Sequence, residues 1–112
     1  MAILSIETSS KVCSVAVHEQ GVELANFTLF TEKSSSGLLT PLIRQILENL
    51  NIKPLELEAI AVAKGPGSYT GLRIGVSTAK GLCLALDKPL IAINTLQAMA
   101  LQVKGKIGRA HV

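Results

Sequence analysis

The feature that most constrains the fold of this chain is a glycine-rich stretch between an apolar run and a helical pattern. The stretch runs from Gly65 to Gly75 and follows Ala59–Ala63, which are typical of a buried strand. A helical pattern then extends from Thr70 to about Leu86. Glycine lets backbone come close to other groups, and the free N–H groups at a helix N-terminus suit an anion. The stretch therefore predicts a tight strand-to-helix turn.

The glycine spacing excludes the two common phosphate-binding motifs. A P-loop needs Gly, four residues, and then Gly-Lys-Ser/Thr. Counting from Gly65, the second glycine position holds Thr70, and counting from Gly67 it holds Leu72. A dinucleotide fingerprint fails as well, because Gly65 and Gly67 satisfy its first gap but Thr70 occupies the next position. Neither motif therefore names a ligand for this turn.

Hydrophobic periodicity and turn residues predict an α/β domain with the element order βββαβαβα. Strands are predicted over Ala2–Glu7, Val12–His18, Val22–Phe30, Leu57–Ala63 and Leu90–Ile93, and helices over Leu38–Leu50, Thr70–Leu86 and Leu96–Val103. Short links predict that the first three strands are antiparallel neighbours, whereas later strands are joined through helices. The sequence therefore predicts one domain over residues 1–103 with a five-stranded mixed sheet, followed by an appended basic tail over residues 104–112.

The two longer predicted helices carry features of a partner surface. The first, with Pro41 expected in its first turn and Asn51 as its C-cap, has more apolar positions than one sheet-facing stripe needs. The second is small-sided, with Gly71, Gly75 and Ala79. Two interpretations stay open, a simple cover for the sheet and an added partner interface. The interface hypothesis comprises Leu39, Leu42, Ile43, Ile46, Arg73, Val76, Ala79 and Lys80.

The charge distribution argues against direct binding of nucleic acid. The formal net charge is +3, but Lys104, Lys106 and Arg109 lie in the last nine residues. The rest of the chain is neutral, and aromatic residues make up only 3% of it. Nucleic-acid binding needs clustered Lys and Arg, and single strands usually stack on aromatic side chains. Direct contact with nucleic acid is therefore expected to be weak and confined to the tail.

The sequence predicts no catalytic and no metal-binding residues. Cys13 and Cys83 lack metal-ligand spacing and are expected to be small buried hydrophobic residues. His18 is expected at the surface of a strand end, and neither it nor His111 has a ligand partner at suitable spacing. Ser68 is not part of a nucleophile elbow.

One polar segment gives an alternative hypothesis of nucleotide binding. Glu7 and the hydroxyl residues after it end the first strand, where a carboxylate and hydroxyl groups can hold a hydrated cation and phosphate oxygens. An ordinary polar turn explains the same residues, because Ser and Thr favour turns. The possible phosphate-binding set is Glu7, Thr8, Ser9, Ser10, Gly65, Gly67 and Ser68.

No targeting or membrane segment is expected. The first residues lack a basic region, and Glu7 ends the apolar run early. No stretch approaches the roughly 18 apolar residues of a membrane span. The sequence therefore predicts a soluble, cytoplasmic chain.

Four segments resemble the TsaB (YeaZ) family. These segments are Ile6–Ser10, Cys13–Ala16, Leu38–Ile43 and, most specifically, Gly65–Gly75, and the resemblance extends over residues 2–103. It departs from the family pattern at Glu7, where Asp is more frequent, and at Ser36-Gly37, where a histidine often stands. Family members are about twice as long, so a second subdomain of similar fold is expected to be missing.

The resemblance implies a fold, a function and partners. The fold would be the first subdomain of an actin/Hsp70-like ATPase, which is ribonuclease H-like. The chain would be a noncatalytic scaffold for a TsaD-like catalytic paralogue and a TsaE-like ATPase, which form N6-threonylcarbamoyladenosine at position 37 of tRNA. No cofactor is expected in this chain, and ATP and Mg²⁺ would act in the partner complex. Without its partner the chain is expected to form a homodimer through the helical face. An ATPase or sugar-kinase-type subdomain is the alternative.

Overall fold

The computed structural model describes residues 2–8, 12–30, 36–63 and 69–93, which form a five-stranded sheet and two long helices. The strands are β1 (Ala2–Thr8), β2 (Val12–Glu19), β3 (Val22–Phe30), β4 (Leu57–Ala63) and β5 (Leu90–Ile93), the helices are α1 (Ser36–Asn49) and α2 (Tyr69–Leu86), and a 3₁₀ helix spans Pro54–Glu56. The predicted strands and the first two helices are confirmed, with boundaries within two residues. The helix predicted over Leu96–Val103 lies outside the described residues.

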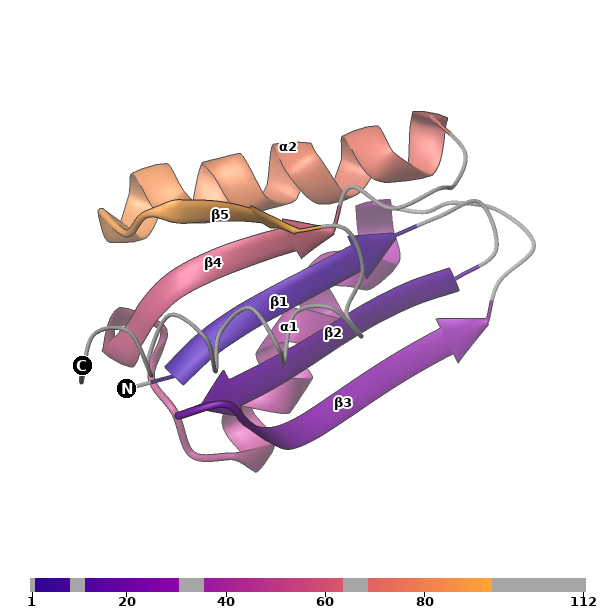
Figure 1. Cartoon of the computed structure of the whole chain (residues 1–112). Helices are drawn as coiled ribbons and strands as arrows, with labels where there is room; N and C mark the ends of the chain where they lie inside the picture. Colours follow the sequence, from indigo (N-terminus) through magenta and orange to yellow (C-terminus); the bar gives the residue numbers. More distant parts are fainter. Residues whose placement is uncertain (1, 9–11, 31–35, 64–68, 94–112) are drawn as a thin grey trace.

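The sheet is mixed, as the sequence predicts. Its strand order is β3-β2-β1-β4-β5 (Figure 1). The β1–β2 and β2–β3 pairs are antiparallel, whereas β4 is parallel to both β1 and β5. The turn between β2 and β3 is tight because Gln20 and Gly21 both have positive φ angles, of 53° and 79°.

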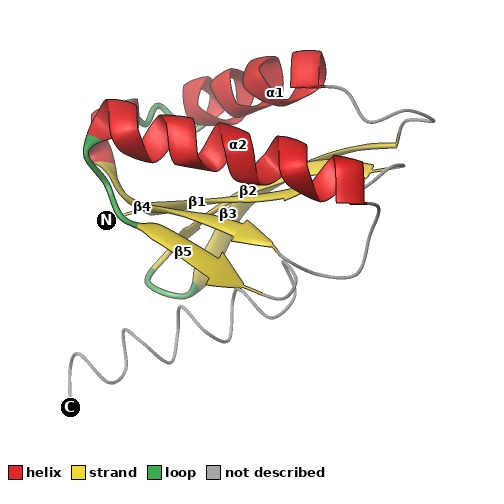
Figure 2. Cartoon of the chain, turned by 90° about the horizontal axis from the view of Figure 1, so that it is seen from above, coloured by secondary structure: helices red, strands yellow, loops and turns green. Residues whose placement is uncertain are grey.

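Both helices cover the same face of the sheet (Figure 2). Alternation along the strands sends one set of side chains toward the helices and the other set to the opposite face. In β1, Leu4 and Ile6 belong to the core under the helices, whereas Ile3 belongs to a separate apolar cluster. We call the side of the sheet that carries α1 and α2 the helical side, and the other side the open side.

The main core lies between the helices and the sheet. From α1 it receives Leu39, Ile43, Ile46 and Leu47, all buried against apolar strand residues. Burying a leucine or isoleucine contributes about 1.5–3 kcal/mol, so this row fixes α1 on the sheet. On α2 the residues nearest the sheet are small, Gly75 and Ala79, and both are buried.

Both helices are followed by a residue with a positive φ angle, and nearby backbone N–H groups donate to carbonyls of the last turn. After α1, Asn51 has a φ of 56° and its N–H donates to the Glu48 carbonyl at 3.1 Å, so its predicted role as a C-cap is confirmed. After α2, Asp87 has a φ of 55°, and the next N–H, of Lys88, donates to the Cys83 carbonyl at 3.0 Å. The expected position of Pro41 was wrong, because α1 begins at Ser36 and therefore places this proline beyond the first turn.

Candidate functional site

The helical side contains an apolar groove between α1 and α2, which we call the interhelical groove. Its volume is about 370 Å³. Leu4 and Leu57, from the sheet, lie among its lining residues, and Leu82 and Leu86 of α2 lie on one side. The other lining residues come from α1 and the segment after it: Thr40, Ile43, Arg44, Leu47, Glu48, Ile52 and Pro54.

The rim of the groove is polar on the α1 side. Thr40, Arg44 and Glu48 are exposed and repeat every four residues, so they share one side of the helix. The buried Ile43 and Leu47 lie beside them and line the deeper part. An apolar floor with a charged rim is typical of protein interaction surfaces. The arrangement suits the insertion of apolar side chains from a partner helix, with polar contacts around them.

The structure divides the residues of the predicted partner interface into two groups. Leu39, Ile46 and Ala79 have no exposed surface and Ile43 is only 7% exposed, so these four side chains belong to the core. Their proposed place in a partner interface is therefore corrected, because the helix layer on the sheet uses these side chains of α1 and α2 for the core of this chain. A charge at Ile43 would disturb folding rather than only an interface.

The other predicted interface residues remain candidates. Leu42 and Val76 are half-buried against the edge of the core, and Lys80 is exposed. Arg73 lies in α2, but its side chain is outside the part that the structure describes. The sequence interpretation missed Thr40, Arg44 and Glu48. The four-residue spacing of these residues beside the apolar stripe indicates a polar edge along α1. The sequence does not show that α2 lies opposite this edge, and a groove forms only because it does.

The residues of the nucleotide-binding hypothesis are only partly described. Glu7 and Thr8 are neighbours on β1 and therefore point to opposite faces. Thr8 is buried under α2, where a Cβ added to Gly75 would lie 2.6 Å from its Oγ1 atom. Glu7 is half-buried on the open side, so the two side chains do not converge on one ligand. Ser9, Ser10, Gly65, Gly67 and Ser68 lie outside the described residues.

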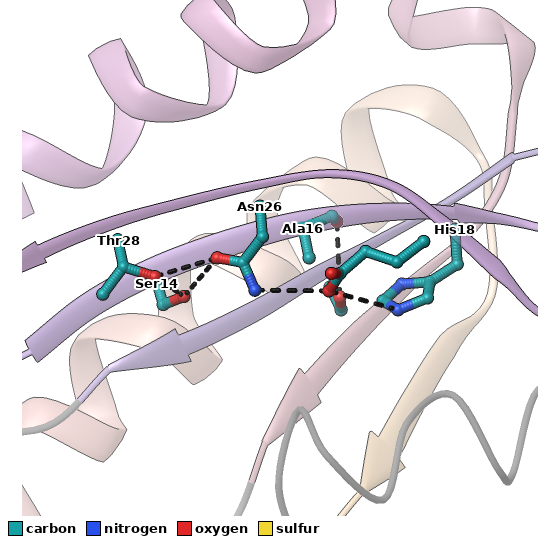
Figure 3. A network of polar contacts seen from close by, with 7 residues as sticks. Ser14, Ala16, His18, Asn26 and Thr28 are labelled. Atoms are coloured by element: carbon teal, nitrogen blue, oxygen red, sulfur yellow. Dashed lines mark hydrogen bonds and ion pairs between the residues drawn. The ribbon is translucent and has the colours of Figure 1, made fainter.

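A polar network crosses β2 and β3 on the open side (Figure 3). Thr28 Oγ1 donates to Asn26 Oδ1 at 2.8 Å, and the Ser14 hydroxyl lies 2.9 Å from Thr28 Oγ1. Asn26 Nδ2 donates to Glu23 Oε1 at 3.2 Å, and the same carboxylate oxygen lies 3.7 Å from His18 Nε2. The network therefore runs along the β2–β3 hairpin, from the Ser14–Thr28 pair to the His18–Glu23 pair beside the turn.

His18 is the buried end of this network, which corrects the expected surface position. Its exposed fraction is 1%, and in the described part of the chain its Nδ1 atom has no hydrogen-bond partner. Burial lowers the pKa of His18 below its usual value, and the nearby Glu23 carboxylate opposes this with a smaller effect. Burial of His18 therefore favours the neutral form of its imidazole.

The cysteines behave as the sequence predicts. Cys13 is buried, Cys83 is half-buried, and both are free thiols. Burial raises the pKa of each thiol, so the reactive thiolate is disfavoured.

Within the described ranges no cluster of His, Cys, Asp or Glu has the geometry of a metal site. No helix of the described part is long and apolar enough to cross a membrane.

Comparison with known proteins identifies the relatives of this chain. A family model described as "TsaD: tRNA N6-adenosine threonylcarbamoyltransferase" matches residues 29–110. The tRNA threonylcarbamoyladenosine biosynthesis protein TsaB of Bacillus subtilis is 38% identical over 89% of this chain and 44% of its own length. The Escherichia coli TsaB protein is 37% identical over 100% of this chain and 48% of its own length. The chain thus spans about half the length of these curated relatives.

Solved structures agree with the sequence relatives. The structure of YeaZ from Pseudomonas aeruginosa superimposes with a TM-score of 0.76 and 31% identity, covering 84% of this chain and 45% of that one. A Bacteroides thetaiotaomicron protein with an actin-like ATPase fold has a TM-score of 0.57 at 12% identity, covers 89% of this chain and 36% of that one, and shares the fold alone. The expected actin-like ATPase fold is therefore confirmed, and this chain belongs to the TsaB (YeaZ) family.

Proposed function

We propose that this chain is a noncatalytic subunit in tRNA threonylcarbamoyladenosine biosynthesis that supports a TsaD-like enzyme through its helical side. The enzyme would form N6-threonylcarbamoyladenosine at position 37 of tRNA. The names of the relatives supply the pathway. The observation that carries the role of this chain is the interhelical groove, an apolar surface with a polar rim.

The physical case for a docking role is the partly exposed apolar lining of this groove. A partner helix that fills the groove would cover Leu82 and Leu86, which are only half-buried in the free chain. Interface cores gain most of their affinity from such desolvated apolar contacts. Arg44 and Glu48 lie on the rim and offer one positive and one negative group for orientation.

The remaining assignments follow from this role. A TsaE-like ATPase would join the same complex, and ATP and Mg²⁺ would be bound at the level of that complex rather than by this chain. Contact with tRNA would be indirect, because basic and acidic groups balance over residues 1–103. We expect the complex to act in the cytoplasm and without a membrane partner.

The role of the groove can be tested with two arginine substitutions on α1. Thr40→Arg places a long charged side chain at the groove, whereas Gln45→Arg places it at an exposed position of the same helix outside the groove. We expect Thr40→Arg to weaken binding to the TsaD-like enzyme of the same organism by about 100-fold. Gln45→Arg should bind like the unmodified chain, as measured by isothermal titration calorimetry.

Circular dichroism and thermal unfolding check that both variants remain folded. Equal binding by the Thr40→Arg and unmodified chains would exclude the groove from the interface.

An assay of tRNA modification in a mixture of purified partners tests the noncatalytic role. The chain alone should form no product, and product formation by the TsaD-like enzyme should depend on adding it.

A further inference from the structure

The turn end of the β2–β3 hairpin has few of the contacts that hold a strand in a sheet. β3 lies at one end of the strand order, so among the described strands only β2 pairs with it. Most of its side chains are exposed, including the first three, Val22, Glu23 and Leu24. Segments with few buried contacts open locally at a lower free energy than the core. We therefore expect the start of β3 to separate from the sheet more readily than the strands inside it.

The backbone also weakens this end of the hairpin. The turn contains Gln20, whose φ of 53° is a left-handed conformation that residues with a side chain adopt rarely. Just beyond the turn, Leu24 is an extra residue on β3, because its two neighbours pair with the consecutive residues His18 and Val17. Such a bulge interrupts the ladder of hydrogen bonds. It separates residues 18–23, which we call the hairpin end, from the regular ladder that follows.

The paired hairpin end holds His18 in an unfavourable environment. The side chain is 1% exposed, and in the described part of the chain its Nδ1 atom has no hydrogen-bond partner. Leaving a buried polar atom unpaired costs free energy. Nε2 lies 3.7 Å from Glu23 Oε1, beyond hydrogen-bond distance, and that oxygen accepts from Asn26 Nδ2 at 3.2 Å (Figure 3). Separation of the two strands here would give the ring access to water.

Of the charged residues in the described part of the chain, Glu23 faces His18 directly. The two residues pair across β2 and β3, and the Glu23 carboxylate is the charge that acts on the imidazole. On the β1 side the paired residue is the apolar Ile3, and Glu7 lies four residues further along that strand. Glu19 follows His18 on β2 and therefore points to the opposite face. Both helices lie on the other side of the sheet (Figure 2).

We propose that the hairpin end opens in a proton-coupled step: it stays paired while His18 is neutral and opens as His18 takes up a proton from solvent. Protonation would otherwise place a charge in a buried site, where the single nearby carboxylate compensates it only in part. In the open form the ring and its charge are hydrated. This proposal goes beyond the proposed function and does not depend on it.

The direction of the pH dependence follows from linkage. In the open form the pKa of His18 is near its usual value of about 6.5, whereas burial lowers this pKa in the closed form. Between the two pKa values the open form binds more protons, so a fall in pH favours it. The ratio of open to closed form should rise by up to about tenfold for each unit that the pH falls in this range. Above the higher pKa the ratio should not depend on pH.

Hydrogen exchange of single backbone amides, followed by NMR at several pH values between about 5 and 8, tests this opening. Each rate is compared with the intrinsic rate of an unfolded amide at the same pH, which gives a protection factor. We expect the protected amides of the hairpin end to be less protected than those of α1. Their protection should fall by up to about tenfold per pH unit below about 6.5. It should respond little to low concentrations of urea, because a local opening exposes little surface.

Three variants assign the effect to the His18 ring. In His18→Gln the protection of the hairpin end should not change with pH, whereas the matched control His111→Gln should behave like the unmodified chain. Glu23→Gln removes the attraction that opposes the effect of burial, so the closed-form pKa of His18 should be lower still. The loss of protection should then continue to a lower pH than in the unmodified chain. Circular dichroism checks that the variants are folded.

Two results with the unmodified chain would overturn the proposal. Protection of the hairpin end that does not change with pH would mean that its opening leaves His18 buried. Protection equal to that of α1, with the same response to urea, would mean that only global unfolding exposes the ring. If His18→Gln does not fold, Glu23→Gln decides the assignment, and a pH dependence identical to that of the unmodified chain would contradict it.

Discussion

Gly75 determines how closely α2 approaches the sheet. An added Cβ at this position would lie 2.6 Å from Thr8 Oγ1 and 3.6 Å from Ile6 Cγ2. Real Cβ atoms do not tolerate the first distance, so α2 or Thr8 would have to move. Thr8 is buried and short, which leaves it little freedom to do so. The glycine is therefore required by packing at this point, although glycine weakens a helix interior.

A pair of alanine substitutions in α2 separates packing from helix propensity. We expect Gly75→Ala to lower the free energy of unfolding by about 1–3 kcal/mol, because overpacking outweighs the gain in propensity. Gly81→Ala should raise it by about 1 kcal/mol, since no atom lies within 4 Å of the added Cβ. Urea unfolding measures both values. Equal stabilisation by the two substitutions would show that Thr8 moves aside without cost.

His18 links stability to pH. In the unfolded chain its pKa is about 6.5, and burial lowers the pKa in the folded chain. Between these two values the unfolded state binds more protons, so stability rises with pH. The contribution is fully present above the unfolded pKa and is lost as the pH falls through the folded pKa.

The measurement is urea unfolding at several pH values between about 5.5 and 7.5, where histidine is the side chain that titrates. We expect the free energy of unfolding to fall toward the acidic end in the unmodified chain and in His111→Gln. The slope should be much smaller in His18→Gln. An unchanged slope in His18→Gln would mean that this histidine does not titrate differently in the folded and unfolded states.

At the scale of elements, the sequence predicted which segments form helices and strands but not all of their facing. Short apolar runs mark β1 and β4, and turn residues mark the start of β3, so the positions of these strands follow from local sequence. The facing of α1 depends on how many helices share the sheet. The sequence of α1 has enough apolar positions to contact both the sheet and a partner. In the structure, however, Leu39, Ile43 and Ile46 are all buried in the core.

The same limit applies to His18 and to the groove. A histidine at the end of a short strand is usually exposed, and local sequence does not indicate that this part of the open side is buried. The groove joins α1 to α2, which are separated in sequence by β4, so its shape depends on tertiary packing. The glycine-rich stretch was the more informative signal, because its specificity led to the correct family and fold.

At the scale of the whole molecule, the two sides of the sheet differ. The helical side carries the interhelical groove, which under the proposed function docks a TsaD-like enzyme.

The most direct test of the central claim is hydrogen exchange on this chain with and without the TsaD-like enzyme of the same organism. We expect slower exchange in α1, in α2 and in the segment around Ile52, the parts that line the interhelical groove. Exchange in β3 should be unchanged by the enzyme at a fixed concentration of the chain. Protection confined to β3 or β5, or no protection at saturating enzyme, would contradict a docking role for the helical side.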